Sequence, residues 1–168
     1  MSERQQGDIA AKNDYEAVAL RFAAAMGADP KAMYDLLADD FVRLGEETLW
    51  QPLGKANYVA MSDNFLSAFP DVSWQVVEVL SDGDRVVLQV VETGTFSRPW
   101  VIGNVEIAPN DRPYSIRGAV FMTIAEGQIH TYTYIHDASF TSTYADVLTD
   151  DFALAYYEFL IAPYAPLD

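Results

Sequence analysis

The sequence predicts an α+β fold in which helices come first and an antiparallel sheet follows. Up to about residue 69, apolar residues recur at helical spacing, with Val18, Phe22 and Met26 forming one stripe. From Val72 onward, apolar and polar residues alternate as they do in half-buried strands. A run of helices followed by a run of strands is typical of the α+β class.

The N-terminal part carries start and stop signals for three helices. Residues 1–12 are polar and are expected to form a flexible tail. The run 13–16 (Asn-Asp-Tyr-Glu) reads as a capping box that starts the first helix, which Gly27 ends. Asp29 caps a second, shorter helix whose first turn holds a proline. A third helix is expected from about residue 55 to 69, where a proline stops it.

The rest of the chain predicts a meandering sheet and one more helix. Hairpin turns are expected at 81–84 and 126–127. Residues 97–112 are expected to form an irregular arm, and residues 138–150 a polar linker. The expected strands and the last helix are a short strand at 41–44, strands at 72–80, 85–96, 113–125 and 128–137, and a helix at 151–161.

Composition limits the function. At 168 residues, 51% of them apolar, the chain is expected to be one domain with a sizeable core. Its net charge of −15 disfavours nucleic acids and anionic membranes as partners. The absence of cysteine excludes thiol catalysis and disulfides. Residues 1–8 do not resemble a signal peptide and no apolar run reaches membrane-spanning length, so we expect a cytoplasmic protein.

The two histidines lie on one segment with two tyrosines. In a strand, His130, Tyr132, Tyr134 and His136 share one face, which can relay protons or stack on a flat substrate. A functionally silent polar face and a dimer interface are the alternatives. The two imidazoles are about 20 Å apart along an extended strand. The sequence therefore predicts no metal site.

Several short sequence motifs occur in the order and at the spacing typical of one protein family. The chain is similar to the SnoaL-like polyketide cyclases of the nuclear transport factor two-like superfamily over roughly residues 13–137. The matching words are Leu37-Ala38-Asp39-Asp40-Phe41, Phe69-Pro70-Asp71, Gly83-Asp84-Arg85-Val86-Val87, Gly94-Thr95, Arg112-Pro113 and Gly127-Gln128-Ile129.

This resemblance implies a cone-shaped roll of curved antiparallel sheet wrapped around three N-terminal helices, with a pocket at one end. Residues 13–137 would form this domain, and residues 138–168 a linker and an accessory C-terminal helix. Ketosteroid isomerase, scytalone dehydratase and limonene epoxide hydrolase are relatives that work without a cofactor. Other relatives only bind ligands or partners, so the fold alone does not fix the function.

The catalytic residues of these relatives are mostly replaced here. Tyr134 stands where many cyclases and the epoxide hydrolase keep an acid on the last strand. The helix-one tyrosine of ketosteroid isomerase corresponds to Phe22, and its oxyanion-hole aspartate falls near Ala119. Its base corresponds to Glu46 or Glu47, two adjacent loop acids that are also typical of a solvated loop.

Three charged residues on predicted strands have two interpretations each. Glu92, in an apolar strand, is either a desolvated general base or an outward-facing acid at the strand end. Arg117 shares a face with Ala119 and Phe121, and either binds an oxyanion inside or forms a surface ion pair. Arg43 has the same two interpretations.

We therefore predict a cofactor-independent enzyme that transfers protons on a hydrophobic, aromatic small molecule, as an aldol or retro-aldol lyase, cyclase or isomerase. The alternative is a non-catalytic binding or interaction module of the same fold. The predicted catalytic residues are Glu92, Tyr134, His136 and Arg117. The predicted substrate-binding residues are Tyr132, Arg43, Phe22, Phe121, Trp100 and Ala119.

Two surfaces predict packing beyond the single cone. Val120 and Met122 lie opposite Phe121 on their strand and are expected to form the contact of a homodimer or higher homo-oligomer. The helix expected at 151–161 has one aromatic side, at Phe152, Tyr156 and Phe159. It is expected to cover the pocket mouth or a neighbouring subunit, or to pack on the outside of the domain.

Overall fold

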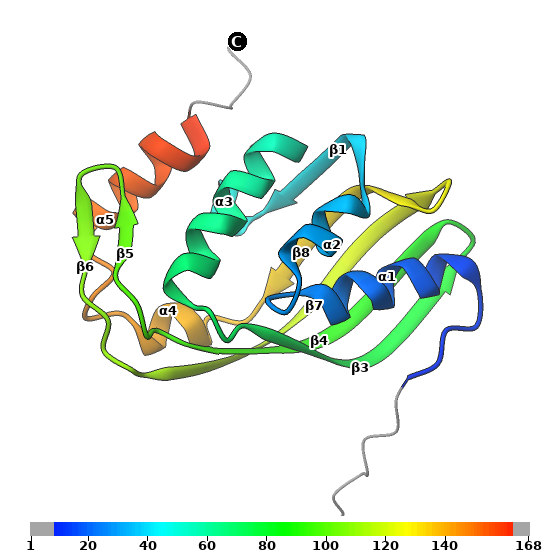
Figure 1. Cartoon of the computed structure of the whole chain (residues 1–168), viewed down its shortest axis with the longest axis horizontal. Helices are drawn as coiled ribbons and strands as arrows, with labels where there is room; N and C mark the ends of the chain where they lie inside the picture. Colours follow the sequence, from blue (N-terminus) through cyan, green and yellow to red (C-terminus); the bar gives the residue numbers. More distant parts are fainter. Residues whose placement is uncertain (1–8, 163–168) are drawn as a thin grey trace, which may run out of the picture.

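The computed structural model describes residues 9–162 and confirms the α+β class. A curved six-stranded sheet wraps around the N-terminal helices, as predicted (Figure 1). The strand order is β2-β1-β8-β7-β4-β3, and β5 and β6 form a separate two-stranded sheet. The residues expected at the start of the N-terminal tail (1–8) and in the proline-rich C-terminal end (163–168) lie outside the described range.

The first two helices begin where the capping signals predict, and the third begins at the expected residue 55 without a side-chain cap. The Asn13 side chain accepts a hydrogen bond from the Glu16 amide, and Glu16 accepts one from the Lys12 amide, so the first turn of α1 is closed. The Asp29 side chain caps the next helix in the same way. The helices are α1 (Asp14–Ala25), α2 (Pro30–Asp35) and α3 (Lys55–Ala68).

The sheet is antiparallel except at one pair. The parallel pair joins β1 to β8, which places Arg43 beside Tyr132 and Gly45 beside Tyr134. This pairing carries the loop after β1 to the far end of β8. The strands are β1 (Leu37–Gly45), β2 (Leu53–Gly54), β3 (Ser73–Asp82), β4 (Arg85–Thr95), β7 (Pro113–Ala125) and β8 (Gln128–His136).

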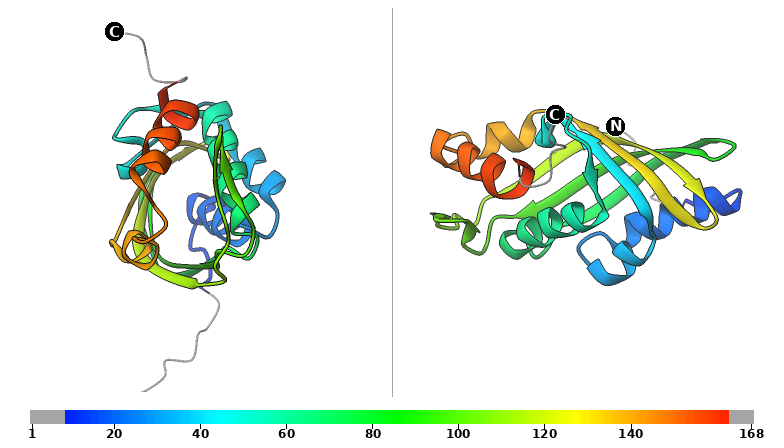
Figure 2. Two further views of the ribbon diagram at one scale, coloured as in Figure 1. Left: turned by 90° about the vertical axis from the view of Figure 1, so that its left-hand side faces the viewer. Right: turned by 90° about the horizontal axis from the view of Figure 1, so that it is seen from above.

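The concave face of the sheet holds the core. Along β4, Val86, Leu88, Val90 and Glu92 are all buried, while the residues between them are exposed or half-buried. Strand parity on β4 is therefore as predicted. Helices α1 and α2 lie toward one end of this face, and α3 lies toward the other (Figures 1 and 2).

The segment expected to be an irregular arm contains a hairpin, which we did not predict. Strands β5 (Trp100–Ile102) and β6 (Val105–Ile107) are joined by a tight turn in which Gly103 has a φ of +57°. The strands are only three residues long, so they give little periodic signal. Helix α4 (Ser139–Thr143) was also not predicted, because a helix of five residues is too short to show helical periodicity.

The C-terminal helix forms as expected and joins the hairpin. Helix α5 (Asp150–Tyr156) continues into one π-helical turn over Tyr157–Ile161. Phe152 packs edge-on against Trp100 of β5, with ring centroids 4.7 Å apart. Helices α4 and α5 and the β5–β6 hairpin lie together at one end of the molecule (Figure 2).

Candidate active site

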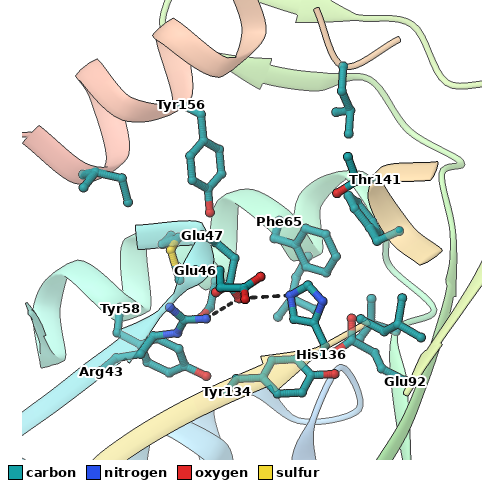
Figure 3. Close-up of a pocket in the computed structure, with 18 of the residues that line it drawn as sticks. Arg43, Glu46, Glu47, Tyr58, Phe65, Glu92, Tyr134, His136, Thr141 and Tyr156 are labelled. Atoms are coloured by element: carbon teal, nitrogen blue, oxygen red, sulfur yellow. Dashed lines mark hydrogen bonds and ion pairs between the residues drawn. The ribbon is translucent and has the colours of Figure 1, made fainter. Parts of the chain in front are cut away.

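A cavity of ≈ 610 Å³ lies between the concave face of the sheet and helices α3, α4 and α5. Most of its wall is aromatic and aliphatic. Polar side chains gather at one part of the wall, at Arg43, Glu47, Glu92, Tyr134 and His136 (Figure 3). A largely apolar cavity with a few convergent polar groups is the usual form of a small-molecule site.

Strand β8 supplies the polar strip that its alternation predicts. Tyr132 and Tyr134 are buried, His136 is half-buried, and all three line the cavity. The residues between them, such as Ile135, face outward. His130 was expected on the same face, but the β7–β8 register shifts there: Thr131 pairs with Thr123 and Ile129 with Ile124, so His130 has no partner on β7. Its Nδ1 lies 2.6 Å from Asp40 Oδ1 on β1, and it is not among the residues that line the cavity.

Glu92 is a buried carboxylate fixed by two donors. The Trp74 indole N–H donates to Oε2 at 2.6 Å, and the Tyr114 hydroxyl donates to Oε1 at 2.8 Å. Burial raises the pKa of Glu92, against the lowering effects of these two hydrogen bonds and of nearby His136. Of the two interpretations of Glu92, the structure therefore supports the desolvated, inward-facing one.

The site depends on a gap at Gly94. Gly94 lies directly opposite Tyr114 in the β4–β7 register. A Cβ on Gly94 would lie 2.9 Å from the Tyr114 ring and 3.1 Å from its hydroxyl. The missing side chain thus lets the Tyr114 ring cross over β4 and reach Glu92, two residues away.

A second polar group joins β1 to β8. Arg43 is buried beneath Tyr58 and Tyr132, its guanidinium carbon 5.9 and 5.5 Å from their ring centroids. Its Nη2 donates to Glu47 Oε1 at 2.5 Å, and that oxygen lies 3.8 Å from His136 Nε2 (Figure 3). Glu47 sits on a 3₁₀ turn over Glu46–Thr48 that directly follows β1.

The Tyr134 hydroxyl is buried and lacks a hydrogen-bond partner among residues 9–162. Burial raises the pKa of Tyr134, and the negative charges of Glu92 and Glu47 add to the effect, so the hydroxyl stays protonated and able to donate. Its ring lies over Gly118, where a Cβ would come within 2.3 Å of Tyr134 Cε2. An unpaired buried donor at a cavity wall is suited to a ligand oxygen.

Three predicted site residues lie outside the cavity, which corrects their inward placement. Arg117, Ala119 and Phe121 share a face as predicted, but that face is the outer one: Arg117 is exposed and Phe121 is 44% exposed. The inward residues of β7 are instead Ile116, Gly118, Val120 and Met122. The alternation along a strand shows which side chains share a face, but not which face points inward. On β7 both faces carry apolar side chains, so either could have been the buried one.

Of the remaining predicted substrate-binding residues, three line the cavity and one packs behind its wall. Tyr132, Arg43 and Trp100 line the cavity. Phe22 is fully buried behind them, its ring 5.7 Å from Tyr132 and 6.1 Å from Trp74. It therefore supports the wall without being part of it.

Several wall residues were missed by sequence reasoning. Trp74 and Tyr114 hold Glu92, yet the sequence shows them only as ordinary strand aromatics. Tyr58 and Tyr156 reach the cavity from α3 and α5. Glu47 was noticed as one of two loop acids, and its position four residues after Arg43 was the available signal for its ion pair.

Within residues 9–162, no three His, Asp or Glu side chains cluster in a way that could hold a metal ion. The same range contains no helix that is long and apolar enough to cross a membrane.

Comparison with known proteins identifies the family. The model of the SnoaL-like polyketide cyclases matches residues 17–141, so the chain belongs to the SnoaL-like polyketide cyclase family. Membership places it in a family of cyclase-type enzymes. No curated protein matches the chain.

Solved structures show the same fold at low identity. AclR from Streptomyces galilaeus, a proposed hydroxylase, is 19% identical over 81% of this chain and 83% of its own, with a TM-score of 0.68. IdmH from Streptomyces antibioticus, a proposed polyketide cyclase, is 19% identical over 79% and 99%, with a TM-score of 0.67. A proposed SnoaL-like cyclase from Jannaschia sp. CCS1 is 22% identical over 83% and 99%, with a TM-score of 0.66. The fold thus hosts more than one proposed chemistry.

Proposed function

We propose that this cavity catalyses proton transfer without a cofactor on a hydrophobic, aromatic small molecule, in a cyclase, C–C lyase or isomerase reaction. One observation carries the proposal. Glu92 is a carboxylate buried in an apolar wall, and burial raises its pKa. A base of this kind accepts a proton near neutral pH more readily than a solvated carboxylate.

The chemistry common to these reactions is an enolate, which in a cyclase or isomerase forms by removal of a proton next to a carbonyl group. Glu92 would take the proton, and the electron pair of the C–H bond would move onto the carbonyl oxygen. That oxygen then needs a donor, and the unpartnered Tyr134 hydroxyl is available on the same wall. The enolate carbon can then attack a second carbonyl or be protonated at another position. In C–C cleavage, Glu92 would instead take the proton of a β-hydroxyl group, which becomes a carbonyl, and the electron pair of the broken C–C bond would form the enolate.

A second candidate is a binding module without catalysis. Each oxygen of Glu92 already accepts one hydrogen bond, from Trp74 and from Tyr114. In this reading the carboxylate serves to fix the Trp74 and Tyr114 side chains, of which Trp74 lines the cavity. In that case the cavity would hold its ligand unchanged.

Solvent deuterium incorporation separates the two candidates. The protein is incubated in D₂O with a panel of aromatic ketones, hydroxy-aromatics and steroids, while thermal shift reports binding. The enzyme proposal expects deuterium at the carbon next to a carbonyl in at least one ligand that binds, and a rate at least a hundredfold lower in Glu92→Gln. Glu78→Gln, at an exposed acid on β3, is the matched control. Stabilising ligands that never gain deuterium would favour the binding module.

A further inference from the structure

Both ring nitrogens of His136 face hydrogen-bond acceptors. Nδ1 lies 2.7 Å from the carbonyl oxygen of Asp137, and a carbonyl oxygen can only accept, so Nδ1 carries a hydrogen. Nε2 points toward Glu47 Oε1 at 3.8 Å. In the neutral ring, the Nε2 lone pair would face a carboxylate. A second proton on Nε2 turns that repulsion into attraction.

We propose that His136 works as an imidazolium that returns the proton during the reaction, and that Glu47 is the positioning residue that keeps it charged. This inference rests on the proposed function, because it adds the acid to the base that Glu92 provides. Glu92, which accepts hydrogen bonds on both oxygens, is arranged as the carboxylate. The two groups line the same cavity, and the charge on His136 in turn favours the ionised form of Glu92.

Glu47 is held in place from behind by Arg43. A guanidinium as buried as that of Arg43 needs a counter-ion, and Glu47 Oε1 accepts from its Nη2. Gly45 makes room for this pair, since a Cβ there would lie 2.6 Å from Glu47 Oε2 and 3.0 Å from Arg43 Nη1. The same Glu47 oxygen therefore faces a fixed cation on one side and His136 on the other.

Other charged and titratable groups also surround His136. Glu92 faces it from β4, and Asp137 follows it in the chain. Burial raises the pKa of Glu92, and the charge on His136 works against that effect. Hydrogen bonds with Ser139 lower the pKa of Asp137, and the charge on His136 adds to that effect. The Tyr134 ring packs against the imidazole at a tilt of 54°, with ring centroids 5.0 Å apart. Tyr156 points from α5 toward Glu47 (Figure 3). Among the described residues, three carboxylates therefore lie around His136, those of Glu47, Glu92 and Asp137, and the Arg43 guanidinium lies beyond Glu47.

The proton balance closes with these two groups. Glu92 gains the proton that leaves carbon, and His136 loses its Nε2 proton to the alkoxide or enolate oxygen that forms. After these two transfers the product has the same charge as the substrate, and Glu92 and His136 are both neutral. One proton transfer from Glu92 to His136 through water in the cavity restores the starting state.

Nitrogen NMR of the His136 ring tests the inference without any substrate. With ¹⁵N-labelled protein at pH 7, we expect both ring nitrogens of His136 to show protonated shifts. A neutral His136 with a proton on Nδ1 alone would overturn the proposal. The only other histidine, His130, pairs with Asp40 and serves as an internal reference.

Two variants assign the effect to Glu47. At pH 7, Glu47→Gln should give the ring nitrogens of His136 the shifts of a neutral imidazole and leave those of His130 as in the original chain. Asp40→Asn should leave the shifts of His136 unchanged. Glu47→Gln should also slow deuterium incorporation about a hundredfold. Protonated shifts at both ring nitrogens of His136 in folded Glu47→Gln would overturn the role of Glu47. If no ligand exchanges deuterium but His136 is an imidazolium, the proposed function fails while the charge assignment stands.

Discussion

At the scale of single residues, the Tyr134 hydroxyl combines two properties that normally exclude each other. It is buried, and it has no hydrogen-bond partner among the described residues. A buried donor without an acceptor costs folding free energy, so its retention points to a partner that arrives with the ligand.

Replacing Tyr134 by phenylalanine tests this role. Because the hydroxyl makes no hydrogen bond to residues 9–162, Tyr134→Phe should leave the melting temperature unchanged or raise it slightly. Loss of an oxyanion donor should cost ~3 kcal/mol in the transition state, roughly a hundredfold in the deuterium-incorporation rate. Tyr15→Phe, at an exposed tyrosine of α1, is the control. A folded Tyr134→Phe protein with an undiminished rate would remove the hydroxyl from the mechanism.

Glu92 should leave a mark on stability as well as on activity. Its pKa is raised in the folded state, so the folded chain holds this proton more tightly than the unfolded chain does. The associated stabilisation is complete below about pH 4.5, the pKa of an unperturbed glutamate, and is lost as pH rises through the folded-state pKa. Above that range the buried charge weighs against folding.

Urea unfolding of the original chain and of Glu92→Gln at a series of pH values measures this linkage. The glutamine cannot ionise, so the stability of the original chain should fall relative to that of Glu92→Gln as pH rises from 4.5. Glu78→Gln should show no such trend, because Glu78 is exposed. A stability difference that is flat over this range would mean that burial does not perturb Glu92.

At the scale of elements, strand parity could be predicted from the sequence but the inward face could not. On β4, Glu92 was correctly grouped with Leu88 and Val90, and on β8 Tyr132, Tyr134 and His136 were correctly grouped, but the sequence left open whether these faces point inward. On β7 both faces carry apolar side chains, and the wrong one was taken as inward. The distinguishing signal was Gly118, whose missing side chain makes room for Tyr134.

Contacts between distant elements were beyond the sequence pattern. The Arg43–Glu47–His136 group needs the parallel pairing of β1 with β8. This pairing brings together residues that are far apart in the sequence, such as Gly45 and Tyr134. Trp74 reaches Glu92 through the β3–β4 register, which depends on a bulge between Val76 and Glu78. Local periodicity contains no information on either.

Helix α5 forms one wall of the cavity, which supports the prediction that the C-terminal segment shapes access. Deleting it would also expose Trp100, so a truncation would confuse folding with access. Ala153 and Leu154 offer a sharper pair. Both are exposed residues of α5, but Ala153 lines the cavity and Leu154 is not among the lining residues.

Tryptophan at each of these two positions tests the wall. Ala153→Trp should raise KM severalfold by narrowing the cavity, with melting temperature unchanged, because the added ring replaces solvent at an exposed position. Leu154→Trp should change neither quantity. Equal KM values in the two variants would place α5 outside the access route, as a helix that simply packs on the domain.

At the scale of the whole molecule, the residues predicted to form the homodimer contact do not lie on the surface. Val120 and Met122 are buried inside the cone and cannot form it. The outer face of the sheet instead carries an apolar row in which Leu80 pairs with Val87 and Val87 pairs with Phe121. Leu80 is 56% and Phe121 44% exposed, and Ile135 lies beside the row on β8. Contiguous exposed apolar side chains of this kind mark interaction surfaces.

We therefore expect two copies to pair through this outer row. Phe121→Asp should convert the dimer to a monomer in sedimentation velocity at micromolar concentration, because it buries a charge in the contact. Val101→Asp, at an equally exposed apolar residue on the separate β5–β6 hairpin, should leave the mass unchanged. Each chain carries a net charge of −15, so raising the salt concentration should screen the repulsion and strengthen the dimer. A monomeric original chain under the same conditions, or a Phe121→Asp variant that stays dimeric, would rule out this face.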